Sequence, residues 1–144
     1  MIYTVMTKMA MRIAFDAHSG QVDKTGMPYI FHPFHLAEQM DSEIDVCAAL
    51  LHDVVEDTPA TFADLLAAGI SEAVIDVLRL LTHTDGVPYM DYVQQIKDSG
   101  NPHAIAVKLA DLRHNSDPTR LDAIDEHMLA RFEKYRQAAE LLVR

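Results

Sequence analysis

The stretch at residues 48–58 reads AALLHDVVEDT and constrains the chain more than any other segment. It places four ionisable side chains, those of His52, Asp53, Glu56 and Asp57, inside an otherwise apolar helical pattern. Burying such groups costs free energy unless hydrogen bonds or opposite charges compensate them. The stretch therefore predicts a core helix with a polar face that needs a partner, and a bound cation is one such partner.

The expected helix runs from about residue 43 to residue 56. At about 100° per residue, His52, Glu56, Asp53 and Asp57 fall on one side of it and the apolar residues on the other. The alternative interpretation is a surface helix whose charged side is only solvated. The His-Asp pair lies between AALL and VV, and ligand-type residues occur elsewhere in the chain, which favours the metal-binding interpretation.

Length and composition indicate one globular domain spanning residues 1–144, because 49% of the residues are hydrophobic and no linker divides the chain. No apolar run approaches the ~20 residues that a membrane span needs. The apolar N-terminus, MIYTVMTKMAMRIAF, is interrupted by Lys8 and Arg12 and lacks a small-residue cleavage site. We therefore expect a first core helix there, neither a signal peptide nor a membrane anchor.

The net charge and the cysteine content limit which partners and which cellular compartment the sequence favours. The net charge of −10 argues against a nucleic-acid partner, which requires a basic face, but leaves room for a small anionic substrate. The single cysteine, Cys47, excludes an internal disulfide and has apolar neighbours. It predicts a buried structural thiol in a protein of the reducing cytoplasm.

Helical periodicity and capping signals recur along the whole chain, and no segment shows a convincing strand pattern. Helices are expected at residues 5–19, 32–40, 43–56, 61–68, 71–81, 88–99, 102–115 and 125–142. The predicted class is all-α, a single helical bundle with the site between helices. The apolar stripe of the last helix suits either core packing or a homo-oligomer contact, and core packing is the expectation.

A second group of polar residues lies in HAIAVKLADLRHN, residues 103–115. Lys108, Asp111 and Asn115 share a helix face there, at i, i+3 and i+7. A carboxylate and an amide beside a lysine suit metal binding and phosphate recognition. The alternative is a helix surface with a Lys108–Asp111 ion pair. The residues expected to turn toward the core are Ile105, Leu109 and Leu112.

Four motifs resemble those of the HD-domain metal-dependent phosphohydrolases: AHSGQ, KTGMPYIFHP, LLHDVVEDT and VKLADLRHN. Within that family they are most similar to the hydrolase domain of RelA/SpoT proteins and to stand-alone small alarmone hydrolases. The motifs occur in family order and cover residues 11–117. Because no synthetase or regulatory sequence follows, the likeness is to a hydrolase-only protein.

The resemblance implies a role for each matching position. The implied ligands of a metal, typically Mn²⁺, are His32, His52, Asp53 and Asp111. Glu56 and Asp57 match the pair that positions or activates the attacking water. The implied substrate contacts are Lys24, Asn115 and Lys108. Two imidazoles and two carboxylates leave open positions on an octahedral ion, which suits phosphoryl chemistry.

Two departures from the family pattern bear on the substrate. The family commonly has an Arg-Lys pair whose arginine stacks on guanine, and this chain has Asp23-Lys24. A carboxylate cannot replace a planar cation in such a stack. The family's usual order of arginine and leucine after Asp111 is also reversed, which moves Arg113 by about 100° around the helix.

The expected function is release of pyrophosphate from the 3′ side of (p)ppGpp, a nucleotide polyphosphate, by a Mn²⁺-dependent hydrolase. Asp23 keeps open an HD phosphohydrolase for a different nucleotide. A non-catalytic metal- or nucleotide-binding regulator is another alternative, although it leaves Glu56 and Asp57 without a task. A helical dimerisation module is a third, and it does not explain the acidic face of the 43–56 helix.

Overall fold

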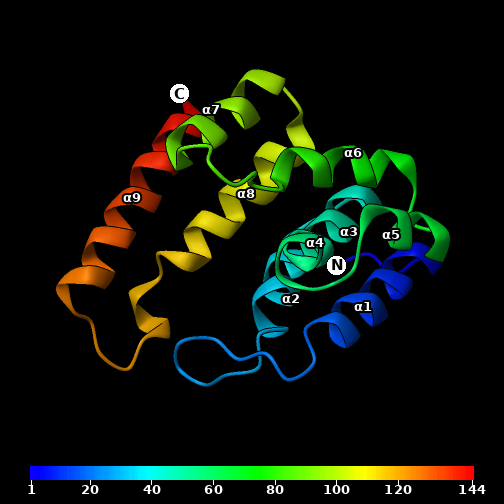
Figure 1. Cartoon of the computed structure of the whole chain (residues 1–144), viewed down its shortest axis with the longest axis horizontal. Helices are drawn as coiled ribbons and strands as arrows, with labels where there is room; N and C mark the ends of the chain where they lie inside the picture. The colour runs from blue at the N-terminus through cyan, green and yellow to red at the C-terminus, as the bar shows by residue number, and fades with distance from the viewer.

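A computed structural model describes residues 1–144 and consists of α-helices joined by short loops (Figure 1). The only β contact is an isolated bridge between Val22 and Pro28, which confirms the all-α class. The helices are α1 (Val5–Ala17), α2 (Phe31–Glu38), α3 (Glu43–Leu51), α4 (Val54–Asp57), α5 (Phe62–Ala68), α6 (Glu72–Leu81), α7 (Tyr89–Ser99), α8 (Pro102–Asn115) and α9 (Glu126–Val143), with a 3₁₀ turn, η1, at Pro118–Arg120. No helix is long and apolar enough to cross a membrane.

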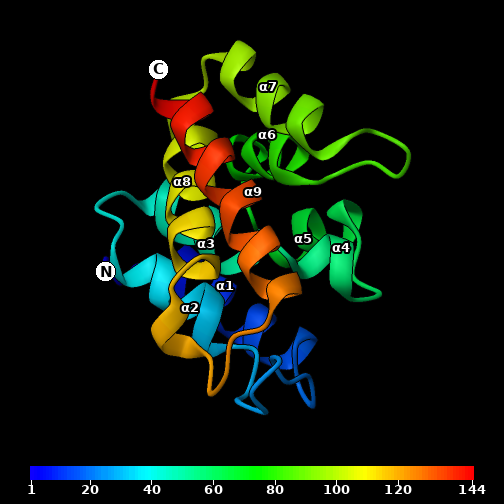
Figure 2. The same cartoon turned by 90° about the vertical axis from the view of Figure 1, so that its left-hand side faces the viewer.

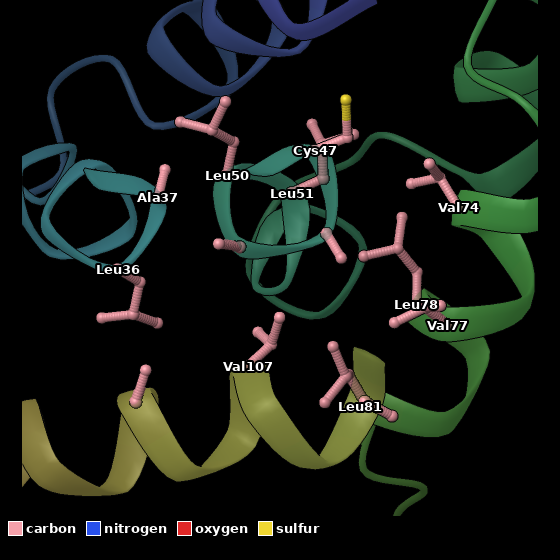
Figure 3. Packing of buried hydrophobic residues seen from close by; sticks show 14 of the residues in the cluster. Leu36, Ala37, Cys47, Leu50, Leu51, Val74, Val77, Leu78, Leu81 and Val107 are labelled. Atoms are coloured by element: carbon pink, nitrogen blue, oxygen red, sulfur yellow. The ribbon is translucent and has the colours of Figure 1, made fainter. Parts of the chain in front are cut away.

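Helix α3 lies at the centre of the bundle. Ser42 caps its start by accepting a hydrogen bond from the Asp45 amide, and every residue from Val46 to Leu51 is buried. A helix that is apolar on all sides needs neighbours on all sides, and α3 packs against α1, α2, α6 and α8. Figure 3 shows side chains of α3 between Leu36 of α2, Leu78 of α6 and Val107 of α8.

The helix expected over residues 43–56 is divided in two, so the prediction of one continuous helix is wrong. Helix α3 ends at Leu51 and α4 begins at Val54. The Ala49 carbonyl, which would accept a bond from residue 53 in a continuous helix, lies 2.7 Å from His52 Nδ1. Asp53 leaves helical geometry with φ −104° and ψ −3°. The break therefore lies at the His-Asp pair.

Most predicted helix ends are confirmed by their caps. Thr61 and Asp64 form a reciprocal capping box at α5, and Ser71, Asn101 and Asp125 cap α6, α8 and α9. Gly69 ends α5 at φ 108°, a conformation that side chains rarely adopt. The expected bounds shift slightly at the first two helices, since α1 ends at Ala17 and α2 begins at Phe31.

Helices α7, α8 and α9 pack together at one side of the bundle, and α9 runs beside α8 (Figure 2). In α8 the core side includes Val107 and Leu112, but Leu109 is only half-buried and lies outside the core, contrary to expectation. In α9 the buried residues are Ala138 and Leu142. The first half of the α9 stripe, including Met128 and Phe132, lines a cleft.

Candidate metal centre and substrate cleft

Three separate segments bring the four expected metal ligands together. His32 lies in the first turn of α2, His52 and Asp53 occupy the break between α3 and α4, and Asp111 lies in α8. One ligand atom each of His32, His52 and Asp53 lies within 4.8 Å of the others. The Asp111 Oδ1 atom is 2.9 Å from His32 Nε2 and 3.3 Å from His52 Nε2. Residues about 80 positions apart in the sequence thus form one cluster, as the motifs predicted.

The surroundings of His52 show whether a cation would fit between these side chains. The His52 side chain is 6% exposed. Its Nδ1 atom lies 2.7 Å from the Ala49 carbonyl and therefore carries the proton in the neutral ring. Its Nε2 atom is buried without a hydrogen-bond partner. Asp53 Oδ2 lies 2.9 Å away, and Asp111 Oδ1 is nearby too. A lone pair facing two carboxylates is stable only with a positive charge between them, so the donor set fits a cation.

The pKa of His52 also indicates that its surroundings favour a positive charge at this position. Burial alone would lower the pKa of His52, but Asp53 and Asp111 outweigh it and raise the pKa well above its ordinary value. In the absence of a metal, a proton therefore supplies the charge. Metal and proton compete for one nitrogen, which makes metal binding dependent on pH.

Asp111 accepts hydrogen bonds from two other side chains of α8. Its Oδ2 atom accepts a hydrogen bond from Lys108 Nζ at 2.9 Å, and its Oδ1 atom accepts one from Asn115 Nδ2 at 3.0 Å. Burial would raise the pKa of Asp111, but the Lys108 ammonium together with His32 and His52 outweighs burial and holds the pKa well below the usual range. Asp111 is therefore ionised at neutral pH although it is 5% exposed. Lys108 is positioned as a partner of Asp111, an expected metal ligand.

Asp53 is fixed from the opposite side by Tyr29, whose hydroxyl donates a hydrogen bond to Asp53 Oδ2. Burial opposes ionisation of Asp53, but His52 outweighs it and lowers the pKa of Asp53 to about 2. Both carboxylates of the cluster are thus anions at neutral pH. Two anionic oxygens with two imidazoles form a ligand set suited to a divalent first-row metal.

Glu56 and Asp57 lie in α4, one turn beyond the ligands. Glu56 accepts a hydrogen bond from the His83 amide and lines a small pocket of about 80 Å³ beside the metal cluster, together with His52 and Lys108. Burial raises the pKa of Glu56. Burial also raises the pKa of Asp57, and Asp53 adds to the effect, but the Asp57 side chain does not line that pocket. The structure therefore brings Glu56 closer to the expected task than Asp57.

A larger cleft of about 340 Å³ adjoins the cluster on its other side, where His32, Tyr29 and Asn115 form part of its wall. Lys24 also lines this cleft and is exposed, without an ion pair or hydrogen bond of its side chain. The opposite wall includes Phe132 and other residues of α9. Lys24 and Asn115 thus share one cavity, whereas Lys108 lies in the smaller pocket behind the ligands.

Three residues near the site make contacts that the sequence did not predict. His83 is half-buried, and its amide donates a hydrogen bond to Glu56. The Nδ1 atom of His114 lies 2.7 Å from Nδ1 of His32. Arg120 received no role, yet it lines the large cleft. These contacts depend on loop paths and side-chain rotamers, for which the sequence carried no periodic signal.

Comparison with known proteins places this geometry in a family. A family model described as HD domain matches residues 10–115, which include His32, His52, Asp53 and Asp111. The chain belongs to the HD domain family. The matched residues include the adjacent His52 and Asp53, at the break between α3 and α4.

Curated relatives of this HD domain chain are much longer proteins. It is 36% identical over 128 residues to the bifunctional (p)ppGpp synthase/hydrolase SpoT of Escherichia coli strain K12, with 75% of the chain and 17% of that protein covered. It is 30% identical over 142 residues to a guanosine-3′,5′-bis(diphosphate) 3′-pyrophosphohydrolase of Aquifex aeolicus, covering 91% of the chain and 19% of the relative. The chain spans less than a fifth of either relative.

A solved structure supports the fold independently. It is described as "A metazoan ortholog of SpoT hydrolyzes ppGpp and plays a role in starvation responses". The TM-score is 0.78, and the match covers 99% of this chain and 88% of the other. At 21% sequence identity the likeness concerns the arrangement of helices. The arrangement of helices is thus shared over 99% of this chain.

Proposed function

We propose that residues 1–144 act as one cytoplasmic hydrolase domain that uses a divalent cation, Mn²⁺ first among the candidates, to release pyrophosphate from the 3′ side of (p)ppGpp. The observation that carries the proposal is the buried Nε2 atom of His52, which lies 2.9 Å from Asp53 Oδ2 and 3.3 Å from Asp111 Oδ1, two ionised carboxylates. The relatives named for (p)ppGpp hydrolysis support the choice of substrate.

His32, His52, Asp53 and Asp111 would hold the cation. His32 qualifies through one tautomer: if its Nδ1–H donates to His114, its Nε2 lone pair turns toward Asp111. Burial and the nearby Arg120 lower the pKa of His114 to about 4, so a neutral His114 is available as the acceptor. The bound ion would supply polarisation of a phosphoryl oxygen and a lower pKa for bound water.

Glu56 is the better candidate for the group that takes a proton from the attacking water. Its carboxylate lies beside the ligands in the small pocket, and burial raises the pKa of Glu56 toward the range useful for a general base. The His83 amide orients it. Asp57 is assigned a supporting role, because its negative charge favours cations near the centre while its side chain lies outside that pocket.

The large cleft is the proposed place for the nucleotide, since it opens beside His32 and has the volume of a small-molecule site. Lys24, which has no partner of its own, would contact phosphate. Asn115 would have a shared task, because its amide nitrogen already donates to Asp111 and its oxygen remains free for substrate or water. Lys108 would act on the substrate mainly through Asp111.

The test is incubation of the purified chain with ppGpp and Mn²⁺, with the products identified by chromatography. We expect pyrophosphate and GDP in equal amounts. A His52→Gln variant should lose both Mn²⁺ binding and turnover, while His103→Gln, on the surface in a pair with Asp45, should retain both. Release of inorganic phosphate instead of pyrophosphate, or turnover that is unchanged by His52→Gln, would refute the proposal.

A second candidate is hydrolysis of a different nucleotide by the same centre. Asp23 favours it, because this residue places a carboxylate in the wall of the large cleft. A parallel assay with adenosine and guanosine polyphosphates separates the two functions. Preferential turnover of an adenosine substrate by the wild-type chain would decide for the second candidate.

A further inference from the structure

Arg120 is a cation of the large cleft that the functions above leave unused. It lies in η1, after α8, where Asp117 caps the turn by accepting a hydrogen bond from the Thr119 amide. Its Nη1 atom donates to the His114 carbonyl at 3.0 Å, and its Nη2 atom lies 3.8 Å from Asp23 Oδ2. The guanidinium is therefore held from both η nitrogens, and its side chain is 27% exposed.

Asp23 is itself committed to the fold of its loop. Its Oδ1 atom accepts hydrogen bonds from the Thr25 amide at 2.8 Å, the Thr25 hydroxyl at 2.9 Å and the Met27 amide at 3.1 Å. This leaves the Oδ2 atom for Arg120. The carboxylate that distinguishes this chain at position 23 thus anchors the loop and positions a guanidinium across the cleft.

The two cations of the large cleft differ in their polar contacts: Arg120 already has partners for its guanidinium, whereas the Lys24 ammonium has none. A guanidinium bound along its edges has fewer N–H groups left for phosphate, but its planar faces remain able to stack on an aromatic ring. Lys24 has three donors free and suits phosphate as a compact charge. The cleft wall also contains Met128 and Phe132 of α9, which suit the flat apolar face of a base.

We propose that Arg120, positioned by Asp23, stacks on the purine base of the bound nucleotide. The inference rests on the proposed function only in taking a nucleotide as the ligand of the large cleft. The proposal assigns base recognition to Arg120 in η1. The other member of the ion pair, Asp23, lies in the loop that also contains Lys24. Asp23 is a positioning residue and Arg120 touches the ligand.

The experiment compares binding of GDP with binding of inorganic pyrophosphate by titration calorimetry. Arg120→Ala should weaken GDP binding about tenfold, the usual scale of a desolvated cation–π contact, and leave pyrophosphate binding within about twofold. Arg120→Lys should restore little, because an ammonium has no stacking plane. Arg113→Ala is the matched control, since Arg113 is exposed on α8 and lines neither cleft.

Asp23→Asn tests the positioning step with the loop hydrogen bonds largely retained. It should weaken GDP binding less than Arg120→Ala, and the double variant should bind GDP no worse than Arg120→Ala alone. Additive losses would overturn the coupling. Equal losses for GDP and pyrophosphate in Arg120→Ala, or a wild-type chain that binds GDP no tighter than pyrophosphate, would overturn base stacking.

The outcome is separable from the hydrolase proposal because binding is measured without turnover. If the wild-type chain shows the expected GDP binding but releases no pyrophosphate from ppGpp, the hydrolase proposal fails and the role of Arg120 stands. If ppGpp is hydrolysed and Arg120→Ala binds GDP as the wild type does, the role of Arg120 fails and the hydrolase proposal stands.

Discussion

Replacement of Lys108 by methionine is the perturbation for which the structure gives the clearest magnitude. Lys108 and Asp111 form an ion pair of 2.9 Å in which the side chains are 11% and 8% exposed. Methionine fills a similar volume but removes the lysine partner of the buried Asp111 carboxylate, which keeps only its contacts with His32, His52 and Asn115. Removing one member of a buried pair costs about 3–5 kcal/mol. For a domain of this size that corresponds to a melting temperature roughly 10 °C lower.

The sign of the pH dependence follows from the lowered pKa of Asp111. A carboxyl whose folded pKa lies below its unfolded pKa contributes stability above the unfolded value, about 3.9 for aspartate, and loses it as the pH falls through the folded pKa. Without Lys108 the folded pKa of Asp111 rises. The variant should therefore be destabilised most at neutral pH, and the difference from wild type should shrink in acid.

Urea denaturation followed by circular dichroism, with EDTA and with saturating Mn²⁺, measures the effect. Lys134→Met is the matched control, because Lys134 lies over the Tyr89 ring at 4.6 Å, as Lys108 does at 5.4 Å, but has no carboxylate partner. The control should lose at most about 1 kcal/mol. The Lys108→Met penalty should fall when Mn²⁺ supplies the missing charge. Equal losses in the two variants, or a penalty that Mn²⁺ leaves unchanged, would refute the reasoning.

Three further predictions concern single groups of the site and core. His52→Gln should abolish the rise in melting temperature that Mn²⁺ gives the wild type, as measured by differential scanning fluorimetry against His103→Gln. Pyrophosphate release should decline as the pH falls through the pKa of Glu56, which burial raises above its ordinary value, and Glu56→Gln should lower kcat by at least ~100-fold; a pH–rate profile measures both. Burial raises the pKa of Cys47 to about 12, so iodoacetamide should label it only upon unfolding, and rapid labelling of native protein would contradict its place in the core.

The sequence predicted the helices well because their caps are local. Thr61 with Asp64, Ser71 and Asn101 bind amides within three residues, so a short window of sequence contains the whole interaction. The break at His52 was not predicted because it accompanies contacts between His52 and residues that are distant in the sequence. At the break His52 lies against both Asp53 and Asp111, and Asp111 is 59 residues further along the chain than His52. Periodicity alone carries no information about such contacts.

The meeting of the four side chains expected to bind a metal was also predictable, because all four lie in recognisable motifs. Their supporting contacts were not. Tyr29 reaches Asp53 across 24 positions, and the His83 amide reaches Glu56 across 27. The position of Arg120 beside Asp23 likewise depends on how η1 folds after α8. From the sequence, Asp23 indicated only that the family's arginine is missing at this position. In the structure, the Asp23 carboxylate lies beside a different cation of the same cleft, Arg120.

The charge balance of the buried cluster bears on how a chain with a net charge of −10 could bind the proposed polyphosphate. Asp53 and Asp111 contribute two negative charges and Lys108 contributes one positive charge, and without a metal the proton on His52 brings the sum to zero. A divalent cation that displaces this proton would bring the cluster to +1. Without Lys108 the same cation would only neutralise the two carboxylates. Lys108 thus sets the sign of the loaded centre, and local charge at short range outweighs a distant acidic surface that salt screens.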